Sequence, residues 1–195
     1  MKIKNTRNTK YKILDTNSGF TLIEVLVSLS IIIMMTTLFL ANYSGGTRSN
    51  NLFLGEQQLV SDLRTSQNRG LGSTPYNGSF PAGGWGIHLS TISNSSYIVF
   101  ADVNGNETYE VGEADQTKGG QTMPLPAGII VSALSTVDGS SNPTSLDITS
   151  LPPDPVTRIY NGTATSSIGY ITLKNTITNQ TSVITVNVLG LIQDE

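Results

Sequence analysis

The sequence predicts an α+β protein in which one long N-terminal helix precedes an antiparallel β-sheet. A predominantly apolar run from Phe20 to Leu40 contains a single charge and predicts the first half of the helix. Leucines at helical spacing, Leu52, Leu59 and Leu63, predict its second half. The C-terminal part of the chain alternates apolar and polar residues, as half-buried strands do.

The run from Phe20 to Leu40 is long enough to span a membrane. A helix of these 21 residues, at 1.5 Å per residue, is about 31 Å long, close to the roughly 30 Å of a bilayer's hydrocarbon core. We expect it to continue to Asn42, which gives a transmembrane helix over 20–42. Basic residues ahead of it, against one acid, predict a cytoplasmic N-terminus and an extracytoplasmic C-terminal domain. They are Lys2, Lys4, Arg7, Lys10 and Lys12.

Glu24 is the one charge inside this span. A cleaved secretory signal would have a shorter apolar core that ends at a small-residue cleavage site. An ordinary single-span anchor leaves Glu24 unexplained, because a carboxylate in a membrane helix costs a few kcal/mol unless it has a partner. Glu24 is therefore a candidate functional residue.

The hexapeptide Gly19-Phe20-Thr21-Leu22-Ile23-Glu24 resembles the processing site of type IV pilins and pseudopilins. The resemblance implies that a prepilin peptidase cuts between Gly19 and Phe20 and that the new Phe20 amine is methylated. Residues 1–19 are then a leader peptide. Glu24 becomes the fifth mature residue, which in this family offsets the N-terminal charge within the packed filament.

An amphipathic helix over 43–72 is expected to continue the anchor. Gly45 and Gly46 weaken the helix between the two parts, so we expect a kink or a short melted segment there. The three leucines share one face, with Phe53 and Val60 beside them. That apolar stripe should pack on a sheet. The polar side of the helix is expected to hold Glu56, Gln57, Asp62 and Arg64.

Residues 73–195 are expected to form an extracytoplasmic, β-rich globular domain. The last two expected strands form a hairpin. The expected strands are Gly84–Leu89, Ser96–Ala101, Ile129–Leu134, Leu146–Ile148, Arg158–Tyr160, Gly169–Lys174 and Ser182–Leu189.

Parts of this domain resemble the GspH/FimT-type minor pseudopilins. The resemblance rests on the Trp85-Gly86-Ile87 strand, the stretch from Val99 to Asn106, and a C-terminal hairpin that ends at Gly190. It implies a pilin-like fold, with a long helix, half transmembrane and half amphipathic, packed on an antiparallel sheet.

The charge of the chain argues against nucleic acid as a partner. The leader holds five basic residues and one acid, so the precursor charge of −3 becomes −7 in the mature chain. A domain of that charge lacks the basic surface that nucleic-acid binding requires. The chain has no cysteine, which excludes disulfides and thiol chemistry.

A partial calcium-loop pattern begins at Asp102. Asp102, Asn104, Asn106 and Glu113 occupy positions 1, 3, 5 and 12 of the twelve-residue pattern, and oxygen ligands are those that Ca²⁺ takes. Position 6, where the sharp turn requires Gly, is Glu107, and the glycine comes early, at Gly105. The alternative, which we favour, is an ordinary turn in which Asn104-Gly105 supplies the positive φ values. No other cofactor is expected.

No enzyme signature is present in the sequence. His88 is the sole histidine in the sequence. Strand alternation places its side chain on the other face of the strand from Ile87 and Leu89, so it is expected at the surface or at a sheet margin. Without a second histidine or a cysteine, a zinc site or a catalytic pair is not expected. Trp85 is expected to pack in the core.

These expectations indicate a non-enzymatic structural subunit. It would be a minor pilin or pseudopilin of a type IV pilus or a type II secretion pseudopilus, anchored in the inner membrane before assembly. Its partners would be prepilin peptidase, other pilin subunits and the inner-membrane assembly platform. One alternative is a DNA-uptake pilin of the FimT type, but the segment Gly190–Glu195 lacks Arg and Lys. The other alternative is a major pilin, and the long irregular loops favour a minor subunit over it.

Overall fold

A computed structural model describes residues 19–118, 122–137, 142–152 and 156–194. The leader apart from Gly19 lies outside the described residues. The chain divides into two compact units, Met1–Asn42 and Tyr43–Glu195.

The N-terminal helix α1 covers Leu22–Leu71. It is helical through Gly45 and Gly46, so the melted segment expected there is not formed. At its end, Thr74 N–H donates to the Arg69 carbonyl at 2.9 Å and Ser73 N–H to the Gly70 carbonyl at 3.0 Å. These two bonds form a Schellman cap in which Ser73, with φ of 48°, takes the left-handed position.

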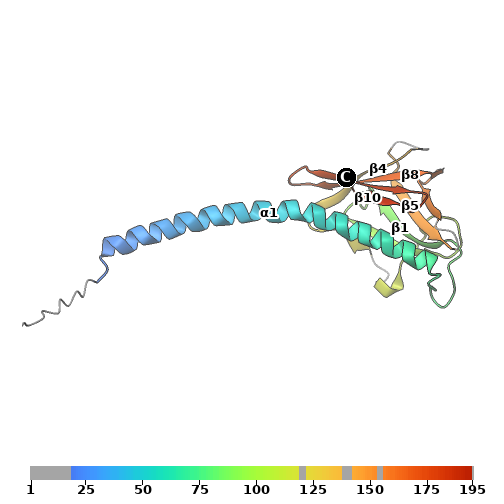
Figure 1. Ribbon diagram of the computed structural model, residues 1–195, viewed down its shortest axis with the longest axis horizontal. Helices are drawn as coiled ribbons and strands as arrows, with labels where there is room; N and C mark the ends of the chain where they lie inside the picture. The colour runs from blue at the N-terminus through green and yellow to red at the C-terminus, as the bar shows by residue number, and fades with distance from the viewer. Residues whose placement is uncertain (1–18, 119–121, 138–141, 153–155, 195) are drawn as a thin grey trace, which may run out of the picture. The chain divides into compact units, whose positions relative to one another are not determined.

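Within the described residues, ten strands follow α1 and form two antiparallel sheets (Figure 1). The first sheet has six strands in the order β3-β2-β1-β5-β6-β7, and the second has four in the order β10-β9-β8-β4. The fold is therefore α+β and pilin-like, with one long helix followed in the chain by two antiparallel sheets. The strands are β1 (Gly84–Ser90), β2 (Ser96–Asp102), β3 (Met123–Pro124), β4 (Ile129–Thr136), β5 (Ser145–Leu151), β6 (Val156–Tyr160), β7 (Thr165–Ser166), β8 (Ile168–Asn175), β9 (Thr181–Asn187) and β10 (Ile192–Asp194).

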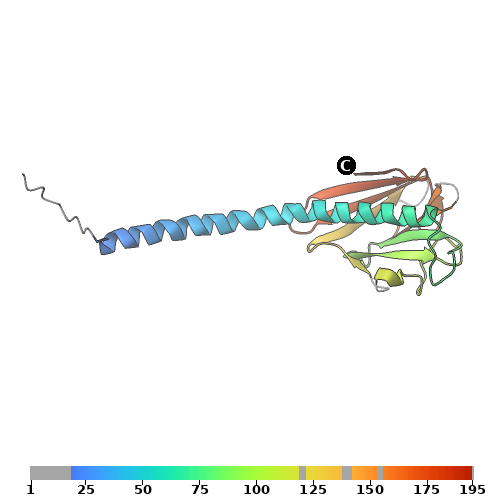
Figure 2. The same cartoon turned by 60° about the horizontal axis from the view of Figure 1, so that its bottom comes forward.

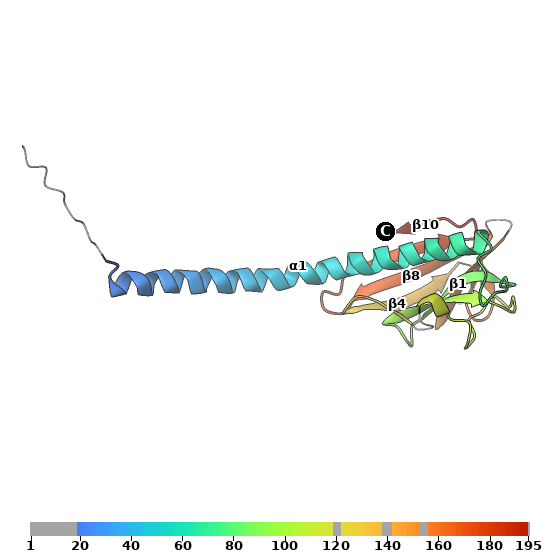
Figure 3. The ribbon, with the colours of Figure 1, turned by 90° about the horizontal axis from the view of Figure 1, so that it is seen from below.

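The C-terminal half of α1 lies along both sheets (Figures 2 and 3). In Figure 2 the orange and red C-terminal strands lie above the helix and the green strands β1 and β2 below it. Leu52, Leu59 and Leu63 are buried there, as the periodicity predicts. Phe53 does not join them, because it follows Leu52 by 100° around the helix, and its side chain is 57% exposed. Trp85 is buried, as expected.

The expected C-terminal hairpin is formed by β8 and β9, with Tyr170 opposite Thr185. The second strand ends at Asn187, two residues before the expected end. The Asn187 side chain accepts hydrogen bonds from the N–H groups of Leu189 and Leu191, both at 3.0 Å, and turns the chain back. The returning residues form β10 on the free edge of β9, a strand that the sequence did not predict.

Candidate functional site

Gly19 and Phe20 lie immediately before the first turn of α1. The first helical acceptor is the Thr21 carbonyl, which receives the N–H groups of Glu24 at 3.1 Å and Val25 at 3.3 Å. The peptide bond between Gly19 and Phe20 is therefore outside the helix. The Phe20 side chain is 84% exposed.

Thr21 and Glu24 form a reciprocal pair across this first turn. Glu24 N–H donates to the Thr21 hydroxyl at 3.3 Å, and Thr21 N–H donates to the Glu24 carboxylate at 3.4 Å. This is the geometry of a capping box, with Thr21 as N-cap and Glu24 as the third helical residue. Sequence reasoning assigned Glu24 to charge pairing and missed this role. The signal was present, since Thr-x-x-Glu directly before an apolar run is a helix-start pattern.

Behind the cap, the 19 residues of Leu22–Leu40 are long and apolar enough to span a membrane. All described side chains from Gly19 to Leu40 are exposed. The hydroxyl groups in this segment donate to backbone carbonyls within the helix, for example Ser28 to Glu24 and Ser30 to Leu26, both at 2.8 Å. Hydroxyls bonded in this way are compatible with lipid, where water is not available as a partner.

The loop from Asp102 to Glu113 is held by two carboxylates. Asp102 is buried and accepts backbone N–H groups from Gly105 at 2.7 Å, Asn106 at 3.2 Å and Glu107 at 2.8 Å. Glu113 accepts the N–H groups of Val103 at 2.9 Å and Glu110 at 3.0 Å. The two carboxylates expected to ligate calcium thus accept backbone hydrogen bonds of the loop itself.

The two asparagines of this loop contact Glu110. The Asn104 amide donates to its carboxylate at 3.3 Å and the Asn106 amide at 2.8 Å. Positive φ occurs at Gly105 and at Glu107. The sequence predicted it at Asn104 and Gly105, so Glu107 takes the position expected for Asn104. Among the described residues, no group of three or more His, Cys, Asp or Glu side chains is arranged to hold a metal ion. Calcium binding by this loop remains a prediction from spacing.

Tyr109 of the same loop lies against two side chains of the six-stranded sheet, His88 and Phe100. Tyr109 packs against His88 with ring centroids 5.1 Å apart and against Phe100 at 5.6 Å. His88 is partly buried, and its Nδ1 lies 2.6 Å from the Asp147 carboxylate on the neighbouring strand β5. Its neighbours thus give His88 a packing role.

Polar side chains on α1 bind both sheets. The hydroxyl of Ser182 donates to Glu56 at 2.8 Å, and the hydroxyl of Tyr97 donates to Asp62 at 2.7 Å. Glu56 and Asp62, expected on the solvent side, therefore lie at the margins of the buried stripe. The reason is that strand residues supply donors for these carboxylates.

These contacts shift three pKa values. Burial raises the pKa of Tyr97 well above its usual range, and Asp62 raises it further. Burial also raises the pKa of Glu56; the Ser182 hydrogen bond opposes this, and the neighbouring Asp194 adds to it. For Asp115, burial acts to raise the pKa, but hydrogen bonds from Thr117 and Arg69 outweigh it, so the pKa is lowered.

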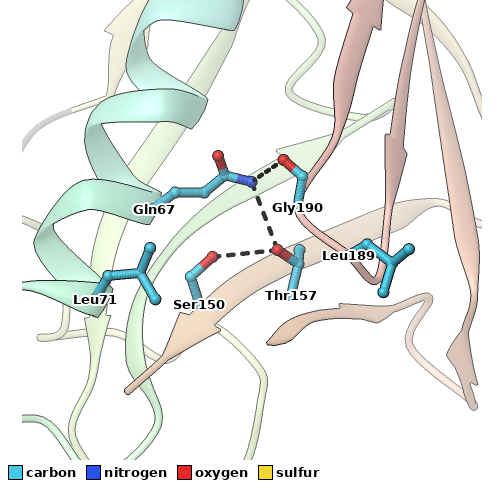
Figure 4. A pocket seen from close by; sticks show the side chains of 6 residues that line it. All are labelled: Gln67, Leu71, Ser150, Thr157, Leu189 and Gly190. Carbon is cyan, nitrogen blue, oxygen red and sulfur yellow. Dashed lines mark hydrogen bonds between the residues drawn. The ribbon is translucent and has the colours of Figure 1, made fainter. Parts of the chain in front are cut away.

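A small pocket of about 90 Å³ lies at the C-terminal end of α1 (Figure 4). Gln67 reaches across it and donates to the Gly190 carbonyl at 3.1 Å. The pocket is well below the roughly 300 Å³ of typical ligand sites, so it gives no basis for a small-molecule function. It is lined by Gln67, Leu71, Ser150, Thr157, Leu189 and Gly190.

Residues 15–40 match the family model of the prokaryotic N-terminal methylation motif. No curated protein and no solved structure matches the chain. The match covers the end of the leader and the apolar half of α1, the region that contains Gly19, Phe20 and Glu24. The motif is that of a type IV pilin-type leader, and it implies a structural subunit, processing by a prepilin peptidase and assembly with other pilins. An apolar helix directly behind such a leader fits anchoring in the inner membrane.

Proposed function

We propose that this chain is a minor pilin or pseudopilin, a structural subunit of a type IV pilus or of a type II secretion pseudopilus. A prepilin peptidase removes residues 1–19, the Phe20 amine is methylated, and the subunit enters the filament through α1. The C-terminal unit remains extracytoplasmic throughout, because the basic leader holds the N-terminus in the cytoplasm.

The observation that carries this proposal is the position of Glu24. It is the only charged residue of the predominantly apolar helix segment Leu22–Leu40, in which every residue is exposed. It is the fifth residue after the proposed end of the leader. An exposed apolar helix lowers its free energy either in lipid or against other apolar helices. A carboxylate on that helix needs a cationic partner, and the new amine of a neighbouring subunit's Phe20 is one.

A minor subunit of the GspH/FimT type is the finer part of the proposal. The supporting features are the β1 and β2 strands around Trp85 and Phe100, the long carboxylate-held loop that follows them, and the β8–β9 hairpin. A major pilin would be the most abundant protein in purified filaments. A minor subunit would be a small fraction of the filament protein, so quantitative mass spectrometry of sheared filaments separates the two.

The experiment that tests processing is mass spectrometry of the protein extracted from membranes, with and without an active prepilin peptidase. We expect loss of residues 1–19 and one added methyl group on Phe20 only when the peptidase is present. Gly19→Leu is the matched variant, because a bulky side chain blocks close approach to the backbone at this position. An intact leader on the wild-type protein beside an active peptidase would overturn the proposed function.

A further inference from the structure

The structure places the bond between Gly19 and Phe20 two residues ahead of the helix start at Leu22. The carbonyls of Gly19 and Phe20 precede the first helical acceptor, Thr21. Hydrolysis of the Gly19–Phe20 bond adds water, with the hydroxyl going to the Gly19 carbonyl carbon and a proton to the Phe20 nitrogen as the C–N bond breaks. The peptidase must therefore reach the Gly19 carbonyl, which accepts no hydrogen bond from the helix that starts at Leu22.

We propose that the Thr21–Glu24 capping box positions this bond for cleavage by fixing the start of α1. The inference rests on the proposed processing function, and it assigns Thr21 and Glu24 as positioning residues for that reaction. The Glu24 carboxylate accepts the Thr21 N–H, and the Thr21 hydroxyl is a second acceptor for the Glu24 N–H beside the Thr21 carbonyl. Their hydrogen bonds favour a helix that begins at Leu22 over one that begins earlier.

An earlier start is available in the sequence. Ser18 is also an N-cap residue type, and a helix capped there would take Gly19 and Phe20 into its first turn. The Gly19 carbonyl would then accept the Ile23 N–H and lie against the helix backbone. The capping box disfavours that state, because Thr21 has non-helical backbone angles as an N-cap.

Glu24 therefore has two separable roles. Its carbonyl-type oxygen completes the capping box before cleavage, and its charge offsets an amine after assembly. Gln serves as well as Glu in a capping box, so Glu24→Gln keeps the first role and removes the second. Thr21→Val keeps the shape and the Glu24 charge but removes the cap hydroxyl. These two substitutions separate positioning from charge pairing.

The test measures the rate of leader removal from the full-length protein in membranes that contain prepilin peptidase. We expect Thr21→Val and Glu24→Leu to be cleaved more slowly than wild type, by up to about fivefold, because loss of a typical N-cap lowers the ratio of the Leu22-start helix to the earlier-start helix by about that factor. Thr21→Ser, Glu24→Gln and the control Thr36→Val should match wild type, since Thr36 lies deep in the helix and its hydroxyl bonds the Ile32 carbonyl at 2.7 Å. All variants should reach the membrane at wild-type levels or above.

A second readout reports the helix start directly. Amide hydrogen exchange of the full-length protein should be slower at Ile23 in Thr21→Val than in wild type, because the Gly19 carbonyl accepts this N–H when the helix starts earlier. Exchange at Ile23 should be unchanged in Glu24→Gln. Normal cleavage of Thr21→Val would overturn the positioning role. Slow cleavage of Glu24→Gln or Thr21→Ser would also overturn it. Both variants keep the cap, so a lower cleavage rate would indicate that the peptidase recognises these side chains directly. Failure of the wild type itself to be cleaved overturns the proposed function and the inference with it.

Discussion

The hydroxyl of Tyr97 on β2 lies 2.7 Å from the carboxylate of Asp62 on α1, and this hydrogen bond ties the amphipathic half of the helix to the six-stranded sheet. Gln58, one turn before Asp62, donates to the same hydroxyl oxygen at 3.1 Å. Tyr97 is buried, so its hydroxyl depends on these two helix residues. The contact joins sequence segments 35 residues apart.

Tyr97→Phe should destabilise the C-terminal unit. A hydrogen bond to a charged group contributes about 1.5–3 kcal/mol, and the substitution removes this bond together with the one from Gln58 while the buried ring stays in place. Urea unfolding of the unit Tyr43–Glu195 measures the loss. Tyr170→Phe on the outer face of β8 is the control and should change the free energy of unfolding by less than about 0.5 kcal/mol. Equal effects of the two substitutions would contradict the role of this contact.

The same substitution should change the response to alkaline pH. The pKa of Tyr97 is raised in the folded protein, so the folded state keeps the phenol proton when unfolded tyrosines release theirs, near pH 10. Its contribution to stability is therefore complete below about pH 10 and is lost as the pH rises further. Tyr97→Phe should lose less stability than wild type between pH 9 and 11, measured from the same unfolding curves.

Glu56→Gln should flatten the pH dependence of stability in the acid range. Burial raises the pKa of Glu56 in the folded state, so its contribution is present below the ordinary value of 4.5 and is lost as the pH rises through the folded value. Gln has no charge to desolvate and still accepts the Ser182 hydroxyl, so the variant should be at least as stable as wild type at pH 7. Asp194→Asn, which removes the neighbouring carboxylate, should shift the curve in the same direction. Parallel curves for wild type and Glu56→Gln would contradict the raised pKa.

Asp102→Ala should destabilise the loop that follows β2. Three backbone N–H groups bond the buried Asp102 carboxylate, and the substitution leaves them without an acceptor. We expect a loss of roughly 3 kcal/mol or more from hydrogen bonds to a charged group. Asn104→Ala, at an exposed position of the same loop, is the matched control and should cost less than about 1 kcal/mol.

Thermal unfolding of the wild-type protein and of Glu113→Gln tests calcium binding at this loop. If the loop is an ordinary turn, millimolar calcium should leave the Tm of the wild type unchanged relative to equal magnesium or EDTA. Calcium binding with a Kd at or below a tenth of the calcium concentration would stabilise the fold by about 1.4 kcal/mol or more and raise the Tm. A calcium-specific rise that Glu113→Gln abolishes would establish the calcium interpretation.

Glu24→Gln and Glu24→Leu should both reach the membrane at wild-type levels or above, because each removes a charge from the apolar segment. Both should be depleted from sheared filaments or cross-linked pseudopilin complexes. Leaving a neighbour's amine without its counter-charge typically costs about 3–5 kcal/mol. Since Glu24→Gln keeps the capping box, its depletion isolates the charge. Normal incorporation of Glu24→Gln would show that charge pairing is not required.

The C-terminal unit should not bind duplex DNA at physiological salt. This unit has six basic and twelve acidic residues, and its charge of −6 repels the phosphate backbone; the segment after Gly190 has no basic residue. A gel-shift titration with the unit Tyr43–Glu195 checks this, with a basic DNA-binding domain as the positive control. Micromolar affinity that weakens steeply with salt would favour the DNA-uptake alternative.

The sequence by itself determined the features that contiguous residues encode. The apolar span from Phe20 to Leu40 and the isolated charge of Glu24 can both be read from local composition. The buried leucines of α1 and the seven longer strands follow from periodicities of 3.6 and 2. The capping box is equally local, and Thr21-x-x-Glu24 could have been recognised from the sequence.

Only the tertiary structure decided how these elements combine. The split into two sheets and the short strands β3, β7 and β10 depend on edges supplied by distant residues, and two or three residues are too few to show a periodicity. The same holds for Glu56 and Asp62, which look like solvent-facing residues on an isolated helix. Each finds a hydroxyl donor on a strand, Ser182 or Tyr97, that is far away in the sequence and near only after folding. Pairing of this kind has no local signal, because its energy comes from groups that the fold alone brings together.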